Sequence, residues 1–212
     1  MLKPESWILS LFDYTTIMVQ PWLEKGYHCI CVDIKHPKGV TVKDKLILVG
    51  TDILTWLPPI KQYKMVFAFP PCTHLAVSGA KHFQSKGLSK LIEGLQLVER
   101  ARKLCVWSKA PYMIENPVGM LSTYWRKPDY KFNPCDYAGY VNNENDSYTK
   151  LTCLWIGNGF IIPQVNPKES ILGSKMHTLV RDSNERSKTP MGFAKAVYEA
   201  NNNNNEVKIN EC

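Results

Sequence analysis

Two segments of the chain end in residues that could work together as a nucleophile and an acid. Cys72 follows two prolines at the end of an apolar run, and Glu115-Asn116 ends a second β-prone run 43 residues later. Both runs are stopped by proline, which cannot donate to a central sheet ladder. In a parallel α/β sheet such strand ends open onto the crevice where ligands bind. A thiol and a carboxyl in one crevice can supply a nucleophile and a proton.

Cysteine is also among the residues that are most often fully buried, so the alternative interpretation of Cys72 is inert core packing. The polar exit after the two prolines and the matching Glu115-Asn116 strand end favour a chemical role.

The hydrophobic pattern predicts an α/β fold in which helices cover both faces of a parallel sheet. Helical spacing of apolar residues is clearest over residues 88–107, and this helix would join two strands in a right-handed βαβ unit. The other predicted helix covers residues 17–25. Predicted strands cover residues 7–12, 28–34, 46–50, 64–69 and 112–114, with 151–156 as an edge or added strand.

Length and composition predict one domain over residues 1–200 and an Asn-rich, disordered tail over 201–212. Residues 142–147 read as a polar loop tip. With no apolar stretch of eighteen residues and no signal-peptide pattern, we expect no membrane span and a cytoplasmic protein. The seven cysteines are scattered without a CxxC motif, which favours free thiols in a reducing compartment and no metal site. Cys29 and Cys31, with His28 and His36 nearby, fit core packing on a strand better than a metal cluster.

The net charge of +7 favours a polyanionic partner, either a nucleic acid or the phosphate of a nucleotide. Basic residues concentrate at 81–109, at Arg126, Lys127 and Lys131, and at 175–195. The middle group is interleaved with three aromatic residues, Trp125, Tyr130 and Phe132. This mixture predicts a base-stacking surface, and the alternative is a solvated face beside a small aromatic core.

Three aspartates and the thiol recur at the ends of successive strands: Asp13, Asp33, Asp52 and Cys72. Their spacing predicts a row of polar groups along one edge of the sheet. Asp33 stands where an acid usually holds a ribose diol, and Asp52 could accept from an adenine amino group. Together they suggest an adenosine-type ligand, although each aspartate alone could be a turn or cap residue.

The order of these motifs resembles that of the DNA cytosine-5 methyltransferases. The matching elements are Leu11-Phe12-Asp13, Val32-Asp33, Thr51-Asp52-Ile53, Pro70-Pro71-Cys72 and Glu115-Asn116-Pro117, followed by a basic strand at Tyr148-Thr149-Lys150-Leu151-Thr152. The remainder resembles a short, phage-associated variety of the family. Its marks are Trp125-Arg126-Lys127-Pro128, Phe132-Asn133-Pro134, the strand at 150–155, Gly173-Ser174-Lys175-Met176-His177 and the segment 186–194.

The resemblance implies a Rossmann-like methyltransferase sheet, S-adenosylmethionine as cofactor and DNA as substrate, with the target cytosine flipped out or single-stranded. Cys72 would add to C6 of the base while Glu115 acts at N3, Asn116 would hold the loop that carries Cys72, and Lys150 and Thr152 would touch the base or its phosphate. The cofactor would contact Phe12, Asp13, Thr15, Asp33, Ile34, Asp52, Ile53 and Pro70. Residues 186–192 would fold back to the first strand and help to close the cofactor pocket.

The chain departs from the family pattern in two places. The first turn, Phe12-Asp13-Tyr14-Thr15-Thr16, lacks the glycines that let a backbone pass close under a cofactor. Only 57 residues follow Trp155, so sequence selectivity would be weak or supplied by a protein partner. These departures keep two alternatives open: a catalytically silent nucleic-acid or nucleoside-binding module, and an enzyme that modifies a pyrimidine nucleotide with another donor.

Overall fold

The computed structural model describes residues 6–77, 83–174 and 187–202. The strands in these ranges form a single eight-stranded sheet. The strand order is β3-β4-β2-β1-β5-β6-β8-β7. The five strands from β4 to β6 run parallel, whereas β3, β8 and β7 each pair antiparallel to a neighbour. The strands are β1 (Trp7–Leu11), β2 (His28–Val32), β3 (Gly39–Lys43), β4 (Leu46–Gly50), β5 (Tyr63–Ala68), β6 (Tyr112–Pro117), β7 (Tyr130–Phe132) and β8 (Thr152–Gly157).

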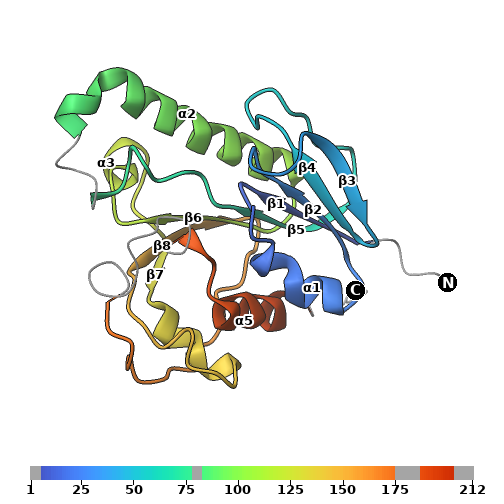
Figure 1. Ribbon diagram of the computed structural model, residues 1–212, viewed down its shortest axis with the longest axis vertical. Helices are drawn as coiled ribbons and strands as arrows, with labels where there is room; N and C mark the ends of the chain where they lie inside the picture. The colour runs from blue at the N-terminus through green and yellow to red at the C-terminus, as the bar shows by residue number, and fades with distance from the viewer. Residues whose placement is uncertain (1–5, 78–82, 175–186, 203–212) are drawn as a thin grey trace, which may run out of the picture.

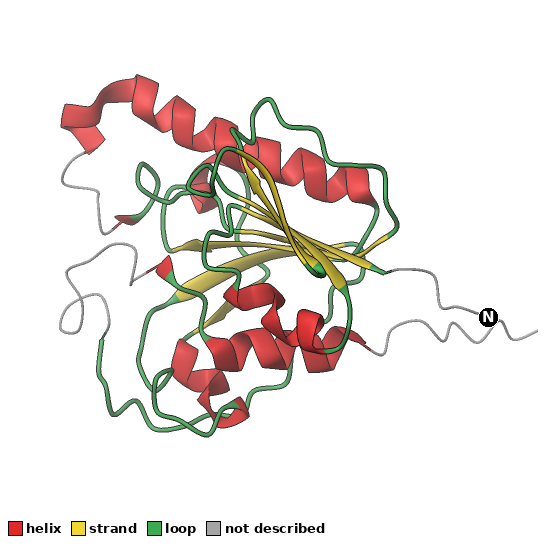
Figure 2. Ribbon diagram, turned by 45° about the vertical axis from the view of Figure 1, so that its right-hand side comes forward, coloured by secondary structure: helices red, strands yellow, loops and turns green. Residues whose placement is uncertain are grey.

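Helices cover both faces of this sheet, which confirms the predicted fold class (Figures 1 and 2). The long helix α2 (Phe83–Ser108) lies on one face. The other face carries η1 (Ile17–Val19), α1 (Gln20–Glu24), η3 (Pro134–Tyr140) and α5 (Met191–Asn202). A further short helix, α3 (Leu121–Tyr124), follows β6. The parallel strands have the doubly wound order, with the chain reversing direction across the sheet between β1 and β5.

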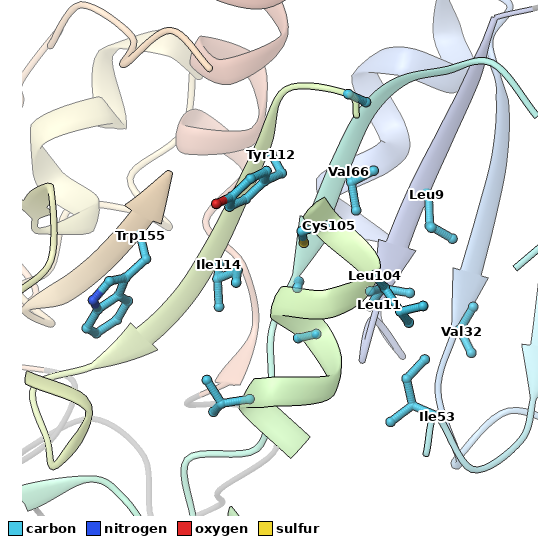
Figure 3. Packing of buried hydrophobic residues seen from close by; sticks show 14 of the residues in the cluster. Leu9, Leu11, Val32, Ile53, Val66, Leu104, Cys105, Tyr112, Ile114 and Trp155 are labelled. Atoms are coloured by element: carbon cyan, nitrogen blue, oxygen red, sulfur yellow. The ribbon is translucent and has the colours of Figure 1, made fainter. Parts of the chain in front are cut away.

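Alternation along the central strands divides the core into two clusters. Leu9 and Leu11 of β1 face α2 and pack with Val66 and Leu104, as Figure 3 shows. Ile8 points to the opposite face, into the cluster beneath α1 and α5. Because successive strand side chains point to opposite faces, a strand buried on both sides must be apolar at almost every position. This is why the central strands read as continuous apolar runs.

The predicted helix 88–107 corresponds to the main body of α2. Gly87 has φ 72° and ψ 176°, which interrupts the helix immediately before Leu88. On the apolar face that this spacing predicts, Val98 and Cys105 are buried, but Leu88 and Ile92 are 69% and 46% exposed, so only the later turns of that face pack in the core. The reason is geometric, because the first turns of α2 project past the strands they would have to cover (Figure 1).

Other predictions need smaller corrections. The strand predicted at 151–156 is β8, which lies inside the sheet between β6 and β7 as an added strand, and β7 forms the edge. The hairpin strand β3, the strand β7 and the helix α5 were not predicted. Helix α5 runs through Asn202, so the first two residues of the predicted tail are helical, and 203–212 lie outside the described residues.

Two buried polar side chains explain how α5 is held. Asn201 donates from Nδ2 to the carbonyl oxygen of Ile161 at 2.9 Å and accepts from the Ile161 backbone N–H at 2.9 Å. Asp146 accepts from the backbone N–H of Gly192 at 2.7 Å, so a carboxylate lies at the N-terminus of α5, where the helix dipole favours it. The segment predicted as a polar loop tip thus ends in two buried residues, Asp146 and Ser147.

Three further observations bear on the class of protein. Within the described ranges, no helix is long and apolar enough to cross a membrane. The same residues contain no group of three or more His, Cys, Asp or Glu side chains that could hold a metal ion. Cys29 and Cys31 are buried in the core, and none of the six described cysteines forms a disulfide.

Candidate functional site

The predicted row of polar residues lies along one edge of the sheet. Leu11, at the end of β1, pairs with Val32 of β2 on one side and Ala68 of β5 on the other. Val32 in turn pairs with Val49 of β4. Because these strands are parallel and end together, Asp13, Asp33, Asp52 and Cys72 all follow strand ends at the same edge. The predicted row of polar residues along one edge of the sheet is confirmed.

Strand β6 continues past the end of β5, which brings Glu115 and Asn116 to this edge. The last pair between the two strands is Ala68 with Ile114. Glu115 and Asn116 then pair only with β8. Asn116 is buried, and its Nδ2 donates to the carbonyl oxygen of Pro70 at 2.8 Å. This bond holds the backbone two residues before Cys72, the role that the family resemblance implied for Asn116.

A second set of contacts joins the chain after Cys72 to the chain after β6. Val77 donates its backbone N–H to the Val118 carbonyl at 3.0 Å, and Met120 donates to the Leu75 carbonyl at 2.8 Å. Between them, Gly119 lies so close that a Cβ there would be 2.2 Å from the Leu75 carbonyl oxygen. The segment that carries Cys72 is therefore anchored both before and after the thiol.

Substitution of Gly119 by alanine tests this anchoring. The added methyl group must displace the backbone at Leu75, so we expect Gly119→Ala to lose about 1–3 kcal/mol of unfolding free energy. We also expect the alkylation rate of Cys72 to change by at least about threefold, because roughly 0.7 kcal/mol is enough for that change. Urea unfolding and iodoacetamide labelling with mass spectrometry measure both.

The matched control is Gly39→Ala in β3, where φ is +97° and no atom lies within 4 Å of the added Cβ. It also introduces backbone strain, but at the opposite end of the sheet. An unchanged Cys72 labelling rate in Gly119→Ala would contradict the anchoring role.

Glu115 points to the face that carries α5, on the same side of β6 as Met113. It lines a cavity of about 10 Å³ with Phe69, Phe132, Lys150, Thr152, Phe193 and residues 187–190. Its Oε1 is buried and accepts no hydrogen bond within the described part of the chain. Burial raises the pKa of Glu115, and the nearby Lys150 ammonium partly offsets that rise. The site therefore favours a carboxyl that still carries its proton.

The antiparallel direction of β8 explains why Lys150 and Thr152 meet Glu115. The start of an antiparallel strand lies where its parallel neighbours end, and Thr152 pairs with Pro117 at that end of β6. Thr152 donates from Oγ1 to the Lys150 carbonyl at 2.9 Å, and the Lys150 backbone N–H donates to Asn133 Oδ1 at 3.1 Å. The structure thus brings Lys150, Thr152 and Glu115 to one cavity, and the contact of Lys150 and Thr152 with a base or its phosphate stays a prediction.

Residues 187–190 are a part of this site that residue patterns alone did not place. The segment was expected beside the first strand and the cofactor, but it lines the Glu115 cavity. Arg186 and His177 of the same predicted region lie outside the described residues. In the sequence, the motif at 186–194 indicated that this segment belongs to a functional site, but it did not indicate which residues the segment contacts.

The first turn is held by its own side chains. Asp13 is buried and accepts from Ser10 Oγ at 2.7 Å, from the Thr16 backbone N–H at 2.7 Å and from Thr15 Oγ1 at 3.3 Å. Phe12 and Thr16 both have φ 58°, a left-handed conformation that usually requires glycine. Burial raises the pKa of Asp13, and these three donors oppose the rise. Asp13 and Thr15 therefore shape the turn where the sequence predicted ligand contacts.

The remaining predicted cofactor residues divide into exposed and buried groups. Asp33 accepts the Lys35 backbone N–H on Oδ1 at 2.8 Å, and Asp52 accepts that of Leu54 on Oδ1 at 2.9 Å. Ile34 beside them is 73% exposed. The side chain of Ile53 instead packs in the core, and Pro70 is buried and binds Asn116. Ile34 and Asp52 are thus exposed at this edge, and Asp33 is half-buried.

The basic and aromatic residues from 125 to 132 do not form the predicted stacking surface. Phe132 is only 2% exposed and stacks on Phe193 with ring centroids 4.2 Å apart. Trp125 packs on Trp155 at 5.8 Å, and Arg126 forms an ion pair with Asp129 at 2.7 Å. The alternative of an aromatic core beside a solvated face describes this region.

No protein-family model matches the sequence, and no curated protein matches it either. Solved structures with a weak likeness are the CcbJ methyltransferase from Streptomyces caelestis (TM-score 0.31, 14% identity, 58% of this chain and 47% of that one), the glycopeptide N-methyltransferase MtfA (0.30, 11%, 59% and 51%) and DhpI in the DhpI-SAM-HEP complex (0.28, 10%, 80% and 64%). This chain thus spans from about half to two thirds of their length. Such weak likenesses do not bear on mechanism.

Proposed function

We propose that the chain is a DNA cytosine-5 methyltransferase-like enzyme in which the Cys72 thiolate adds to C6 of a cytosine. The observation that carries this proposal is the hydrogen bond from Asn116 to the Pro70 carbonyl, which joins the strand end bearing Glu115 to the segment bearing Cys72. A nucleophile and an acid from strands 43 residues apart in sequence are thereby held at one edge of the sheet.

Each group has a defined task in this chemistry. Attack by the thiolate forms a sulfur–C6 bond while Glu115 delivers a proton, or a hydrogen bond, to N3, so negative charge does not accumulate on the ring. This raises electron density at C5, which becomes the methyl acceptor. A base then removes the C5 proton, the sulfur–C6 bond breaks, any proton that N3 received returns to Glu115, and the aromatic ring is restored. Thiolate sulfur suits both steps because it is a strong nucleophile and leaves readily.

S-adenosylmethionine, when bound, would supply the methyl group. The adenosine half fits the residues at the ends of β2 and β4. Asp33 uses one carboxylate oxygen within its own turn, which leaves the second for a ribose diol. The Ile34 side chain offers an apolar surface for adenine, and Asp52 has a carboxylate for its amino group.

The substrate base would have to enlarge the Glu115 cavity. A volume of about 10 Å³ holds roughly one water molecule, far less than a pyrimidine. Residues 187–190 form one wall of this cavity and belong to no strand, so they are the part that would move to admit a flipped or single-stranded cytosine. Selection of a DNA sequence would then come from a protein partner.

Calorimetric titration with S-adenosylmethionine tests the cofactor assignment. We expect micromolar binding by the native chain and binding weaker by about ten- to a hundredfold in Asp33→Asn, since one charge-assisted hydrogen bond contributes roughly 1.5–3 kcal/mol. This substitution keeps Oδ1 as acceptor for Lys35 and replaces the other oxygen by an amide. Asp44→Asn, at the β3–β4 turn, is the control and should bind like the native chain. No binding at millimolar cofactor would sink the methyltransferase assignment.

The first turn favours a second candidate, a silent nucleic-acid or nucleoside-binding module of the same fold. Phe12 and Thr16 place side chains where glycine would leave room, and the Asp13 carboxylate is already committed to the turn. A chain that binds oligonucleotide, rejects S-adenosylmethionine and forms no bond through Cys72 would be such a module. If Cys72 reacts with a pyrimidine while the cofactor is rejected, another donor is used.

A further inference from the structure

A second cavity, larger than the one that Glu115 lines, lies next to the segment that follows Cys72. It has a volume of about 390 Å³ and lies between the segment after Cys72, the start of α2 and α3. Its lining residues are His74, Gln84, Lys86, Gly87, Leu88, Lys90, Leu91, Met120 and Tyr124. This volume is within the usual range for small-ligand sites.

The lining combines an apolar surface, an aromatic ring and two cations. Leu88 and Tyr124 are 69% and 52% exposed, so a leucine from the start of α2 and a tyrosine ring from α3 line this hollow outside the core. Lys86 and Lys90 lie on the two sides of the helix break at Gly87, and both line this cavity. The Nδ1 atom of His74 is buried without a hydrogen-bond partner in the described part of the chain, and buried polar atoms are normally paired.

One contact fixes this cavity relative to the thiol. Lys86 donates from Nζ to the carbonyl oxygen of Thr73 at 2.9 Å, so the cation is held one residue from Cys72. An ammonium group has three donors, and this bond uses one of them. Lys90 pairs with the exposed Glu93 at 2.6 Å, a surface ion pair of small net energy. Both ammonium groups can therefore also bind an anionic group in the cavity.

We propose that this cavity binds the nucleotide next to the target cytosine in single-stranded or unpaired DNA. The neighbouring base stacks on Tyr124 and packs against Leu88 and Leu91, and its phosphate lies between Lys86 and Lys90. Stacking on an aromatic ring with cations along the backbone is the usual way in which proteins bind single strands. The inference rests on the proposed function only for placing the target base at Cys72. It makes the substrate an oligonucleotide and not a free nucleotide.

Fluorescence anisotropy with a labelled single-stranded pentadeoxynucleotide, cytosine at its centre, tests the assignment over a range of salt concentrations. We expect the double variant Lys86→Met/Lys90→Met to bind at least about tenfold more weakly. Its slope of log affinity against log salt should fall by about 0.7, the value for one neutralised phosphate of a single strand. Tyr124→Leu should weaken binding by at least about fivefold with the slope unchanged, since stacking does not release counterions.

The control is Lys103→Met/Lys109→Met, which removes the same charge near the other end of α2, where Lys103 also pairs with a glutamate, Glu99. Its affinity should stay within about twofold of the native chain, since exposed charges beyond a Debye length of about 10 Å are screened. The proposal is overturned if the native chain does not bind the pentanucleotide, if the Lys86/Lys90 variant binds like the control, or if deoxycytidine monophosphate competes as well as the pentanucleotide.

These outcomes separate the cavity from the chemistry at Cys72. Covalent trapping by Cys72 with no effect of Lys86, Lys90 or Tyr124 would overturn the cavity assignment and leave the proposed function standing. Loss of oligonucleotide binding in the variants, with no trapping by the native chain, would support the cavity and overturn the proposed chemistry.

Discussion

Replacing Cys72 by alanine is expected to abolish covalent capture of a single-stranded oligonucleotide that contains 5-fluorocytosine. Fluorine at C5 cannot leave as a proton does, so the adduct between sulfur and C6 would persist after methyl transfer in the native chain with S-adenosylmethionine. Without the thiol no such bond can form, and the rate should fall by at least about 10⁴-fold, as when a covalent nucleophile is removed. A denaturing gel and intact-mass spectrometry measure the adduct.

Cys135→Ala is the matched control for this experiment. Cys135 lies in η3 and is buried, whereas Cys72 is partly exposed, and its replacement likewise deletes one thiol. It should form the adduct at the native rate. An adduct in Cys72→Ala, or its loss in Cys135→Ala alone, would contradict the assignment of the nucleophile.

Glu115→Gln is expected to slow the same reaction by about 10²–10⁴-fold, the usual contribution of a general acid. Glutamine has a similar shape and can still donate a hydrogen bond, but it cannot transfer a proton. Because burial holds the pKa of Glu115 above its ordinary value, the native rate should persist to higher pH than an ordinary carboxyl would allow. Rapid-quench measurement of adduct formation against pH tests both statements, and a variant with the native rate would contradict the role of Glu115 as acid.

The same substitution has a predicted effect on stability with a definite sign. A carboxyl whose pKa is raised on folding binds its proton more tightly in the folded chain. The contribution of Glu115 to the free energy of unfolding is therefore fully present below its ordinary pKa of 4.5. It is lost as pH rises through the pKa of Glu115 in the folded chain. Glutamine does not ionise, so Glu115→Gln should gain stability relative to the native chain as pH increases. Urea unfolding at about pH 4 and about pH 8 measures this difference.

Glu99→Gln on α2 is expected to change stability with pH in the opposite direction to Glu115→Gln. Glu99 bonds to Arg102 at 2.7 Å, and this hydrogen bond lowers its pKa, so its contribution is present above the ordinary pKa and is lost as pH falls. That variant should lose stability at neutral pH. A Glu115→Gln variant that is also less stable at about pH 8 would show that the native carboxylate is stabilised in the folded chain, against the burial argument.

Local residue patterns were sufficient for the central strands, for the main body of α2 and for the edge at which the polar residues meet. Runs such as 64–69 are apolar at almost every position and stop at proline, and Gly87 marks the start of a regular helical pattern. These signals act over a few residues, so they can be read without knowing the neighbours. That Asn116 holds the loop carrying Cys72 was expected from the family resemblance and not from local pattern, and the structure identifies the Pro70 carbonyl as its partner.

Contacts between distant segments decided the rest. Asn201 was predicted to be disordered because it begins an asparagine tract, yet it is buried since the backbone of Ile161 satisfies its amide. Phe132 was predicted as a stacking platform, but Phe193 covers it from 61 residues away. Residues 187–190 meet Glu115 only because α5 packs beneath β6–β8. In each case burial depends on which segment, distant in sequence, packs against the side chain. Neither the periodicity nor the composition of the sequence near the residue identifies that segment.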